Sequence, residues 1–428
     1  MNVEKTKIMT RMIFDKDVRK SLFEIYSIFK EDENFSLKRL LIAMRNMAKG
    51  EKIVRFEGKY IISPFLPPFP SKAFIENILA VNEPTNIFTQ QIRAKRRAPI
   101  SIYLCLTNKC PNNCVYCSAK HRDREGELTT EEWIKVIKDL QDMKTSIIGL
   151  TGGDPMMRDD IFDIVGAIDE RSASILFTSG INLTPEKARE LKKRGLFSVG
   201  ISLDSYDKDT HNKNRNSDKA FDYAVKAMQT SRSAGLYTLS QTVVLKENLD
   251  EEELFKLFKF AGENGAHEVK ILEPILSGNL LSTKDLSKIM FTEEDRKKLI
   301  AIQHKANKKR NLPKITTFAY TESEEKYGCG AGTQHSYISA AGDLYPCDFV
   351  PMSFGSVKET SVAELWSEMN GIIGAPKIGC FGQAVNKEVY ERANGKLPLC
   401  KEESTEICKR CRSETLPKYY RDLQGLGY

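Results

Sequence analysis

From residue 100 onward, short apolar runs alternate with amphipathic helical stretches. The apolar runs, rich in Ile, Val and Leu, predict strands at 100–106, 146–151, 173–178, 197–203, 238–245 and 268–273. Periodicity of the helical kind predicts helices between them, at about 130–143, 159–170, 184–194, 217–234 and 250–263. Because each helix acts as a crossover between consecutive strands, we expect the six strands to form one parallel sheet.

A different pattern precedes this repeat. Apolar residues at helical spacing predict a helix over 14–30, and Ser36 is a good N-cap for a second helix. Residues 52–63 predict two short strands around a Glu-Gly-Lys turn. The proline-rich segment 64–70 is expected to be extended and apolar, with a further helix after it. Residues 1–98 are therefore expected to form a small α+β module.

The overall composition is that of a globular protein with two or three domains. The chain has 428 residues, of which 41% are hydrophobic and 29% charged. No apolar run approaches the roughly 18 residues needed to span a bilayer, and the first residues lack the apolar core of a signal peptide. We therefore expect a cytoplasmic protein. Its ten cysteines are better explained there as metal ligands than as disulfides.

The net charge of +7 is concentrated at the N-terminus. Residues 1–98 hold 19 Lys and Arg against 11 Asp and Glu, and they include the basic run 93–97. The run is either a solvated surface or a contact for an anionic substrate or membrane. Because no aromatic residues are interleaved with it, binding to nucleic acid is not expected.

Three cysteines follow the first predicted strand of the repeat. Cys110, Cys114 and Cys117 lie on one loop and can hold one metal site, but they leave a fourth position open. A zinc site closed by His121 is the alternative. Cys105 lies inside the strand and is expected to be a buried structural thiol.

The spacing Cys-x3-Cys-x2-Cys, with Tyr116 before the last cysteine, resembles the signature of the radical S-adenosylmethionine (SAM) enzymes. The resemblance implies a [4Fe–4S] cluster on the three cysteines, whose open iron binds the amino and carboxyl groups of SAM. An electron from the cluster then cleaves SAM to a 5′-deoxyadenosyl radical. It also implies an α/β fold in which residues 99–275 form a partial (β/α)6 TIM-like barrel.

Further SAM-binding residues follow from the same resemblance. The loop Gly152-Gly153-Asp154-Pro155 resembles the family's Gly-Gly-Glu-Pro motif, with Asp in place of Glu, and an ordinary glycine turn is the alternative. Ser179 lies in a turn that resembles the one near the ribose in relatives. The remaining candidates follow the fourth strand; they are Ser202, Asp204 and Arg215. Arg215 is implied to pair with the SAM carboxylate, or else is an exposed residue on a helix N-terminal turn.

Six cysteines in the last hundred residues form a second candidate metal site. Cys329 and the later Gly-x4-Cys347 resemble the entry to SPASM and twitch domains, which carry auxiliary [4Fe–4S] clusters. The resemblance implies that Cys408 and Cys411 complete four ligands. Cys380 and Cys400 cannot supply a second full cluster, which would need non-cysteine ligands or an open iron. A structural zinc on the same four cysteines is the alternative.

These interpretations divide the chain into four parts. We expect an N-terminal docking module (1–98), the radical SAM barrel (99–275), a connector (276–328) and a cysteine-rich iron–sulfur domain (329–428). The resemblance implies a flavodoxin or ferredoxin as electron donor and abstraction of hydrogen from an unactivated C–H bond.

The substrate and the protein class stay open at this point. A peptide substrate is favoured, with a lipid or isoprenoid at an anionic membrane surface, or a small metabolite, as alternatives. A non-catalytic iron–sulfur carrier or scaffold is the alternative of another class. No residue is identified as a catalytic acid or base.

Overall fold

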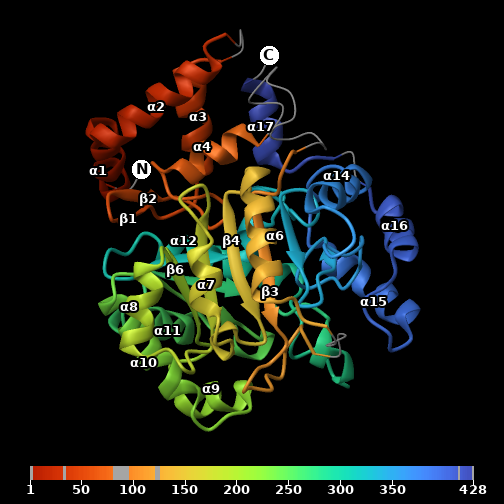
Figure 1. Cartoon of the computed structure of the whole chain (residues 1–428). Helices are drawn as coiled ribbons and strands as arrows, with labels where there is room; N and C mark the ends of the chain where they lie inside the picture. Colours follow the sequence, from red (N-terminus) through yellow and green to blue (C-terminus); the bar gives the residue numbers. More distant parts are fainter. Residues whose placement is uncertain (1–2, 32–34, 81–95, 121–125, 413–414, 427–428) are drawn as a thin grey trace.

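A computed structural model describes residues 3–31, 35–80, 96–120, 126–412 and 415–426 (Figure 1). Its central feature is one large, mostly parallel sheet. Six of its strands match the predicted repeat: β3 (Ser101–Thr107), β4 (Ile147–Gly152), β5 (Ala173–Thr178), β6 (Ser198–Ser202), β7 (Tyr237–Val243) and β8 (Glu268–Leu272). They run side by side in chain order and all are parallel. The predicted parallel α/β sheet is thus confirmed.

Three further strands extend this sheet at its two ends. β9 (Lys314–Thr317) adds to β8 in parallel, and β10 (His335–Ile338) adds to β3 in parallel. The short β11 (Leu344–Tyr345) pairs with β10 in the antiparallel sense. The ammonium of Lys270 on β8 donates to the Tyr103 hydroxyl on β3 at 3.1 Å, although four strands lie between them. The sheet is therefore curled into an open barrel.

Amphipathic helices cover the outside of the barrel. They are α6 (Thr130–Asp142), α7 (Ile161–Gly166), α8 (Pro185–Lys193), α10 (Ala220–Ser233), α11 (Glu251–Glu263) and α12 (Glu293–Ala306). The polar helix α9 (Lys208–Arg215) instead lies against the cysteine loop, where the Asn214 and Arg215 carbonyls accept from the Val115 and Asn113 amides. Local sequence explains where they begin: Thr129 and Glu132 form a capping box at the start of α6. Short 3₁₀ turns follow three strands, at Pro155–Met157, Lys246–Asn248 and Gly278–Ser282. The predicted helices are confirmed, whereas α9 lies in a stretch where no helix was predicted.

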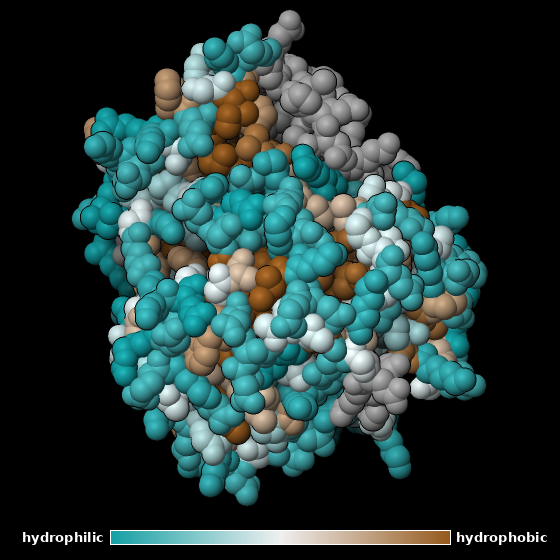
Figure 2. Space-filling model, viewed as in Figure 1, coloured by the Kyte–Doolittle hydropathy of each residue, from teal (hydrophilic) through white to brown (hydrophobic). Residues whose placement is uncertain are grey.

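The N-terminal module contains the predicted helices and hairpin. Its elements are α1 (Val3–Phe14), α2 (Lys16–Phe29), α3 (Leu37–Met47), β1 (Val54–Phe56), β2 (Lys59–Ile61) and α4 (Lys72–Leu79). Ser36 caps α3 as predicted, by accepting from the Arg39 amide. The outer faces of its helices expose large apolar side chains, including Phe14, Phe23 and Leu41, and Figure 2 shows hydrophobic residues gathered near α3.

The module also closes the amino-terminal end of the barrel. Pro67 and Pro68 lie against a set of residues that begin the barrel strands: Ile147, Ala173, Ser198, Tyr237 and Glu268. Phe56 of the hairpin packs edge-on against His267 and Tyr237, with ring centroids 4.9 and 5.5 Å apart. The apolar side chains of segment 64–70 therefore pack inside the protein and do not form a membrane-binding surface.

The basic run at 93–97 is divided by the structure. Residues 93–95 lie outside the described residues. Arg96 is buried, and its guanidinium donates to the side chain and backbone of Asn77 and to the Ala98 carbonyl. Arg97 donates to the Asp142 carbonyl. Arg96 is thus a structural residue, neither solvated nor available to an anionic partner.

The C-terminal region packs on two different parts of the molecule. α14 (Val362–Ile373), α15 (Phe381–Ala393) and α16 (Lys401–Arg410) lie beside the β3 edge of the barrel (Figure 1). α17 (Lys418–Leu426) instead joins the core of the N-terminal module, where Tyr419, Tyr420 and Leu423 contact residues of α3 and α4. The short α13 (Phe318–Thr321) follows β9. Among the described helices, none is both long and apolar enough to cross a membrane.

Candidate cluster sites and active site

The loop with the three cysteines leaves β3 at the carboxyl end of the barrel. The Asn279 side chain donates to the Cys114 carbonyl at 2.7 Å, and the Asn279 amide donates to the Cys117 carbonyl at 3.0 Å. A side chain on Gly278 would collide with the Cys117 backbone, since its Cβ would lie 2.0 Å from that carbonyl oxygen. The segment after β8 therefore fixes the course of the cysteine loop.

The three thiols share one loop, in which Cys114 is buried, Cys117 is half-buried and Cys110 is exposed. The pKa of the Cys110 thiol is still raised to about 11, because neighbouring atoms remove water from its sulfur and the charges of Asp154, Cys114 and Cys117 oppose a further negative charge. The Arg215 guanidinium contacts the Cys114 sulfur at 3.7 Å. Iron–sulfur clusters are held by thiolates, and three thiolates beside one arginine fit a [4Fe–4S] cluster with one iron left for another ligand. His121, the predicted alternative zinc ligand, lies outside the described residues.

The glycine loop after β4 packs directly on the cysteine loop. The Gly153 amide donates to the Thr107 carbonyl at 2.6 Å, and the Asp154 amide donates to the Lys109 carbonyl at 2.8 Å. A Cβ on Gly153 would lie 2.2 Å from that Lys109 oxygen, and Gly152 has a φ of 144°. Both positions therefore need glycine for a close approach between two backbones. Pro155 is buried and begins the first 3₁₀ turn.

The Asp154 carboxylate is fully used within the protein. It accepts hydrogen bonds from the Thr178 hydroxyl at 2.8 Å, from the Ser179 hydroxyl at 2.6 Å and from the Ser179 amide at 2.9 Å. It also caps the 3₁₀ turn by accepting from the Met156 amide. Asp154 and Ser179, both predicted SAM contacts, are thus joined to each other, and the aspartate ties the ends of β4 and β5 together.

Asp204 and Arg215 form a buried ion pair below the cysteine loop. The Arg215 Nε and Nη2 atoms donate to the two Asp204 oxygens at 2.7 and 2.8 Å. The Tyr116 hydroxyl also donates to Asp204. Burial opposes ionisation of Asp204, but Arg215 and His211 hold the pKa of its carboxyl below the ordinary value. Three predicted site residues therefore form one network.

This network corrects the alternative placement of Arg215. The residue is the last of α9 and is 8% exposed, so it is neither exposed nor on a helix N-terminal turn. His211 on the same helix accepts from the Asp204 amide through Nδ1, and burial lowers its pKa to about 4. Ser202, the remaining predicted contact, is the last residue of β6 and lies at the same carboxyl edge. The predicted SAM contacts thus come together at one end of the barrel.

The C-terminal cysteines lie in two groups near Lys377. The Cys380 thiol donates to the Cys329 sulfur, which lowers the pKa of Cys329 and raises that of Cys380. The amide of each of Cys329 and Lys377 donates to the carbonyl of the other, and this backbone bridge brings Cys380 close to Cys329. Cys347 lies close enough for a charge on Cys329 to raise its pKa, although burial is the larger cause. The first group is therefore Cys329, Cys347 and Cys380.

Cys408 and Cys411 form a second group beside Lys377. Burial raises the pKa of Cys408 to about 12, and its charged neighbours are Lys377 and Cys411. Cys400 is exposed, and its thiol donates to the Glu403 carboxylate at 3.3 Å. Lys377 has Cys329, Cys408 and Cys411 as charged neighbours, so both groups approach one side chain. Cys329 and Cys380 are paired, whereas Cys347 lies with His335 and Asp348, all within 4.8 Å of one another. The set of four auxiliary ligands therefore stays a prediction, and Cys105 is buried, as predicted.

An internal cavity joins the barrel lumen to this first cysteine group. We call it the lumen cavity; it is lined by Tyr103, Gln241, Lys270, Leu272, Phe318, Glu322, Cys329, His335, Cys347 and Asp348, among others. Gly149 makes room for the Tyr103 ring in it, because a Cβ there would lie 2.4 Å from that ring. Apart from Cys329 and Cys347, the sequence prediction missed these lining residues. The available signal was Lys270, a single basic residue inside an otherwise buried strand.

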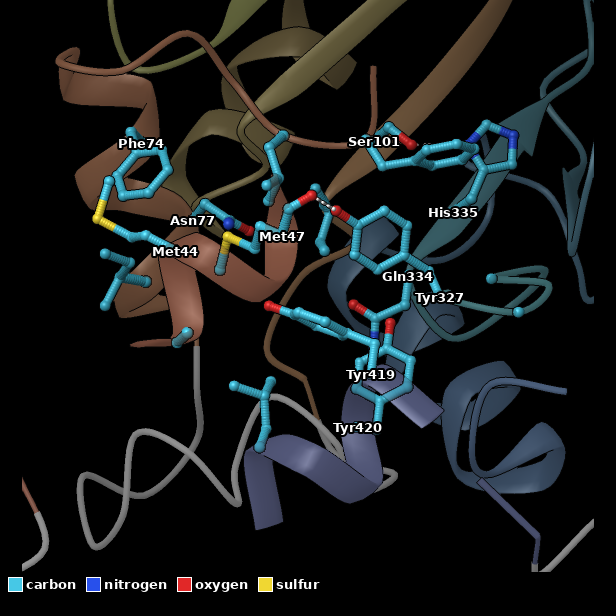
Figure 3. Close-up of a pocket in the computed structure, with 18 of the residues that line it drawn as sticks. Met44, Met47, Phe74, Asn77, Ser101, Tyr327, Gln334, His335, Tyr419 and Tyr420 are labelled. Carbon is cyan, nitrogen blue, oxygen red and sulfur yellow. Dashed lines mark hydrogen bonds between the residues drawn. The ribbon is translucent and has the colours of Figure 1, made fainter. Parts of the chain in front are cut away.

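A second, apolar cavity of about 90 Å³ adjoins the lumen cavity. We call it the apolar chamber. Figure 3 shows Met44, Met47, Phe74, Tyr327, Tyr419 and Tyr420 around it, contributed by α3, α4, α17 and the segment before β10. Phe65, Ser101, Gly330 and His335 line both cavities, so the two meet at the amino end of β10. The Ser101 hydroxyl and His335 Nδ1 are hydrogen-bonded there at 2.9 Å.

Known proteins share these features. The sequence model of the radical SAM superfamily matches residues 104–258, and that of the SPASM domain, an iron–sulfur cluster-binding domain, matches residues 329–412. The AdoMet-dependent heme synthase of Methanosarcina barkeri is 29% identical over 348 residues, which are 75% of this chain and 93% of the relative. The heme synthase of Nitratidesulfovibrio vulgaris is 27% identical and covers 72% of this chain and 86% of its own.

Solved structures with the same fold include Streptococcus suis SuiB bound to its precursor peptide SuiA. Its TM-score is 0.55 at 17% identity, over 64% of this chain and 65% of SuiB, so the chain spans just under two thirds of SuiB. The structure of anSMEcpe with bound AdoMet and a peptide gives a TM-score of 0.52 at 16% identity, over 76% of this chain and 95% of its own. Both domain matches contain the cysteines described above. The chain therefore belongs to the radical SAM superfamily and carries a C-terminal SPASM domain, so that [4Fe–4S] clusters and SAM are its cofactors.

Proposed function

We propose that this protein removes a hydrogen atom and an electron from an unactivated C–H bond of a substrate held in the lumen cavity. When bound, the first cluster supplies the electron that cleaves SAM to methionine and a 5′-deoxyadenosyl radical, and the auxiliary cluster accepts the electron that the substrate gives up. The products are then methionine, 5′-deoxyadenosine and a substrate oxidised by two electrons, which loses a proton or gains a new bond.

One observation carries this proposal: the lumen cavity contacts both the barrel interior and the first C-terminal cysteine group. Tyr103 and Lys270 line it from the barrel strands, and Cys329 and Cys347 line it from the SPASM region. Enclosure of the cavity keeps the reacting carbon away from water and competing donors. Cys110, Cys114 and Cys117 are proposed to hold the first cluster, and Cys329, Cys347 and Cys380 to hold part of the auxiliary one.

The protein's own residues prepare the first site. Asp204 orients Arg215, so that its guanidinium lies beside the Cys114 sulfur. The backbone contacts between Gly153 and Thr107 hold the SAM-binding loop against the cysteine loop. We propose that Gly152, Ser179 and Ser202 contact SAM, as predicted, at this edge of the barrel. The reductant is proposed to be a flavodoxin or ferredoxin.

A peptide is the first proposed substrate class. Exposed apolar side chains on α2 and α3, such as Phe23 and Leu41, offer a docking surface on a module with a surplus of basic residues. SuiB and anSMEcpe, which share the fold, were solved with peptides. A haem precursor is the second candidate, because the Methanosarcina barkeri and Nitratidesulfovibrio vulgaris relatives, which align over most of their length, are heme synthases.

Anaerobic turnover tests the proposal. Reconstituted protein with SAM and dithionite is expected to form 5′-deoxyadenosine, whereas the triple variant Cys110→Ala, Cys114→Ala, Cys117→Ala forms none. A pooled peptide library and an iron porphyrin with carboxylate side chains are then added in separate arms, and mass spectrometry follows loss of two hydrogens or of carbon dioxide. SAM that binds to the loaded, reduced protein without forming 5′-deoxyadenosine in either arm would refute the radical function.

A further inference from the structure

We propose that Lys270 binds a carboxylate of the substrate in the lumen cavity. The inference rests on the proposed function and names the chemical group by which its substrate is recognised. Lys270 lies in the middle of β8 and is 5% exposed. Its ammonium donates one hydrogen bond, to the Tyr103 hydroxyl at 3.1 Å.

Comparison with the other buried lysines shows what is missing at Lys270. Lys314 donates to the Glu51 carboxylate and the Ile62 carbonyl. Lys326 donates to two backbone carbonyls, and Lys377 to the Ile373 carbonyl. Within the described chain, Lys270 has neither an anion nor a carbonyl within hydrogen-bond distance. Lysine is almost never fully buried unless it is paired, so this ammonium is prepared for a partner that the protein does not supply.

The acidic groups around Lys270 are engaged elsewhere or lie across the cavity. Glu268, two residues earlier on the same face of β8, accepts from the Tyr237 and Thr316 hydroxyls at 2.8 and 2.7 Å. Glu273 is held by Arg296 through two hydrogen bonds. Glu322 lines the cavity but makes no ion pair with Lys270 within 4.0 Å. An incoming carboxylate therefore meets little competition.

The surroundings of the ammonium favour an anion that also has an apolar body. The ammonium lies 4.9 Å from the Phe318 ring centroid, 5.4 Å from that of Phe177 and 5.7 Å from that of Tyr103. These rings supply cation–π attraction and exclude water but leave two N–H donors without an acceptor. The same cavity adjoins the apolar chamber, with which it shares Phe65, Ser101, Gly330 and His335.

The position of Lys270 suits the reaction. It lies two residues before Leu272, the last residue of β8, which is about 7 Å along a strand. Leu272 pairs with Val243, whose amide donates to Asp204 at 3.2 Å. A carboxylate bound to Lys270 would therefore lie two residues along β8 from the edge where the SAM-site residues gather. Cys329 and Cys347 line the same cavity.

The test compares matched acids and neutral analogues. Binding to the reconstituted, SAM-loaded protein is measured by saturation-transfer NMR for hexanoate against hexanamide, for N-acetylglutamate N-methylamide against its glutamine analogue, and for a carboxylated iron porphyrin against its methyl esters. We expect wild type to prefer at least one acid by tenfold or more over its neutral partner. Lys270→Met should abolish that preference, Lys270→Arg should retain it, and Lys309→Met should leave it unchanged. Lys309 is a suitable control, because it also lies over an aromatic ring but is exposed.

Two results would overturn the inference. One is the absence of any acid preference in wild type, and the other is an acid preference that persists in Lys270→Met. Should Lys270→Met fail to fold, the neutral variant Lys270→Gln takes its place, with the same expected loss of the acid preference. The peptide and porphyrin arms separate two sources of the carboxylate. Formation of 5′-deoxyadenosine is measured in parallel in the peptide and porphyrin arms. Its presence without acid preference defeats this inference alone, and its absence from both arms while SAM is bound, despite an acid preference, defeats the proposed function alone.

Discussion

The Lys314 ammonium donates to the Glu51 carboxylate at 2.7 Å, and solvent reaches neither side chain. This pair joins β9 of the barrel to the segment between α3 and β1. Removing one partner of a buried ion pair leaves the other charge unpaired, which typically costs about 3–5 kcal/mol. We therefore predict that Glu51→Gln lowers the free energy of unfolding by about 3 kcal/mol, measured by chemical denaturation.

A matched control exists for this prediction. Glu57 also links the N-terminal module to the barrel, through Lys192 on α8 at 2.8 Å, but its side chain is 45% exposed. Glu57→Gln should change the free energy of unfolding by less than about 1 kcal/mol. Equal effects of the two substitutions would show that burial does not govern the strength of these links.

The Asp204–Arg215 pair should control both stability and cluster loading. Asp204→Asn leaves the Arg215 guanidinium buried beside Cys114 without its carboxylate, and we expect a loss of about 3 kcal/mol of stability. Iron content should fall as well, because one amide oxygen must replace the two carboxylate oxygens that accept from Tyr116 and Arg215, which weakens the support of the cysteine loop. Denaturation and iron analysis measure the two effects.

The double variant Asp204→Asn, Arg215→Met separates the pair from its parts. It removes the unpaired charge and should recover part of the stability lost in Asp204→Asn. The exposed pair Lys208 and Asp222 serves as the control, and Asp222→Asn should cost less than about 1 kcal/mol. The loss of unfolding free energy in the double variant is compared with the sum of the losses in Asp204→Asn and Arg215→Met. A larger loss in the double variant than that sum would contradict the ion-pair explanation.

Cys380 and Cys400 should behave differently toward iron. Cys380 contacts Cys329 in the interior, whereas Cys400 is exposed beside Glu403. We predict that Cys380→Ala lowers the iron content by about four atoms per chain, the content of one [4Fe–4S] cluster, and that Cys400→Ala does not. Iron and sulfide counting and the electron paramagnetic resonance of the reduced protein provide the measurement. If Cys400→Ala lost iron and Cys380→Ala did not, Cys400 rather than Cys380 would be the cluster ligand.

Stability should fall in mild acid through His267. Burial lowers the pKa of this imidazole from 6.5 to about 4, and its Nδ1 accepts from the Thr238 amide. The neutral imidazole therefore stabilises the fold, and this contribution is complete above pH 6.5. Between pH 6.5 and 4 the unfolded chain binds a proton that the folded chain does not, so the contribution decreases as the pH falls. From pH 7.5 to 5.5 this contribution should fall by about 1 kcal/mol.

The variant His267→Gln isolates that effect from the other histidines. It keeps a neutral acceptor but cannot titrate, so the difference in unfolding free energy between wild type and variant should shrink by about 1 kcal/mol over the same range. A difference that is constant with pH would show that His267 does not titrate in this way.

The sequence predicted the barrel well because its signals are local. Strand runs such as 173–178 and caps such as Ser36 act within a few residues, and the structure reproduces them. The cysteine groups were harder to predict, since Cys380 reaches Cys329 through the backbone bridge at Lys377, which spacing does not reveal. The lumen cavity was not predicted for the same reason. Its walls come from strands far apart in the chain. That Lys270 has no carboxylate partner among the described residues is visible only after folding.

The pairing of β10 with β3 has a consequence for electron transfer. Cys329 lies shortly before β10 and Cys110 shortly after β3, and the two strands are joined by a parallel ladder that begins at His335 and Ser101. The separation of the two cysteine groups is therefore set by backbone hydrogen bonds in the sheet rather than by surface loops. Because tunnelling rates depend steeply on distance, an electron that passes between the two sites would travel over a gap that loop motions hardly change.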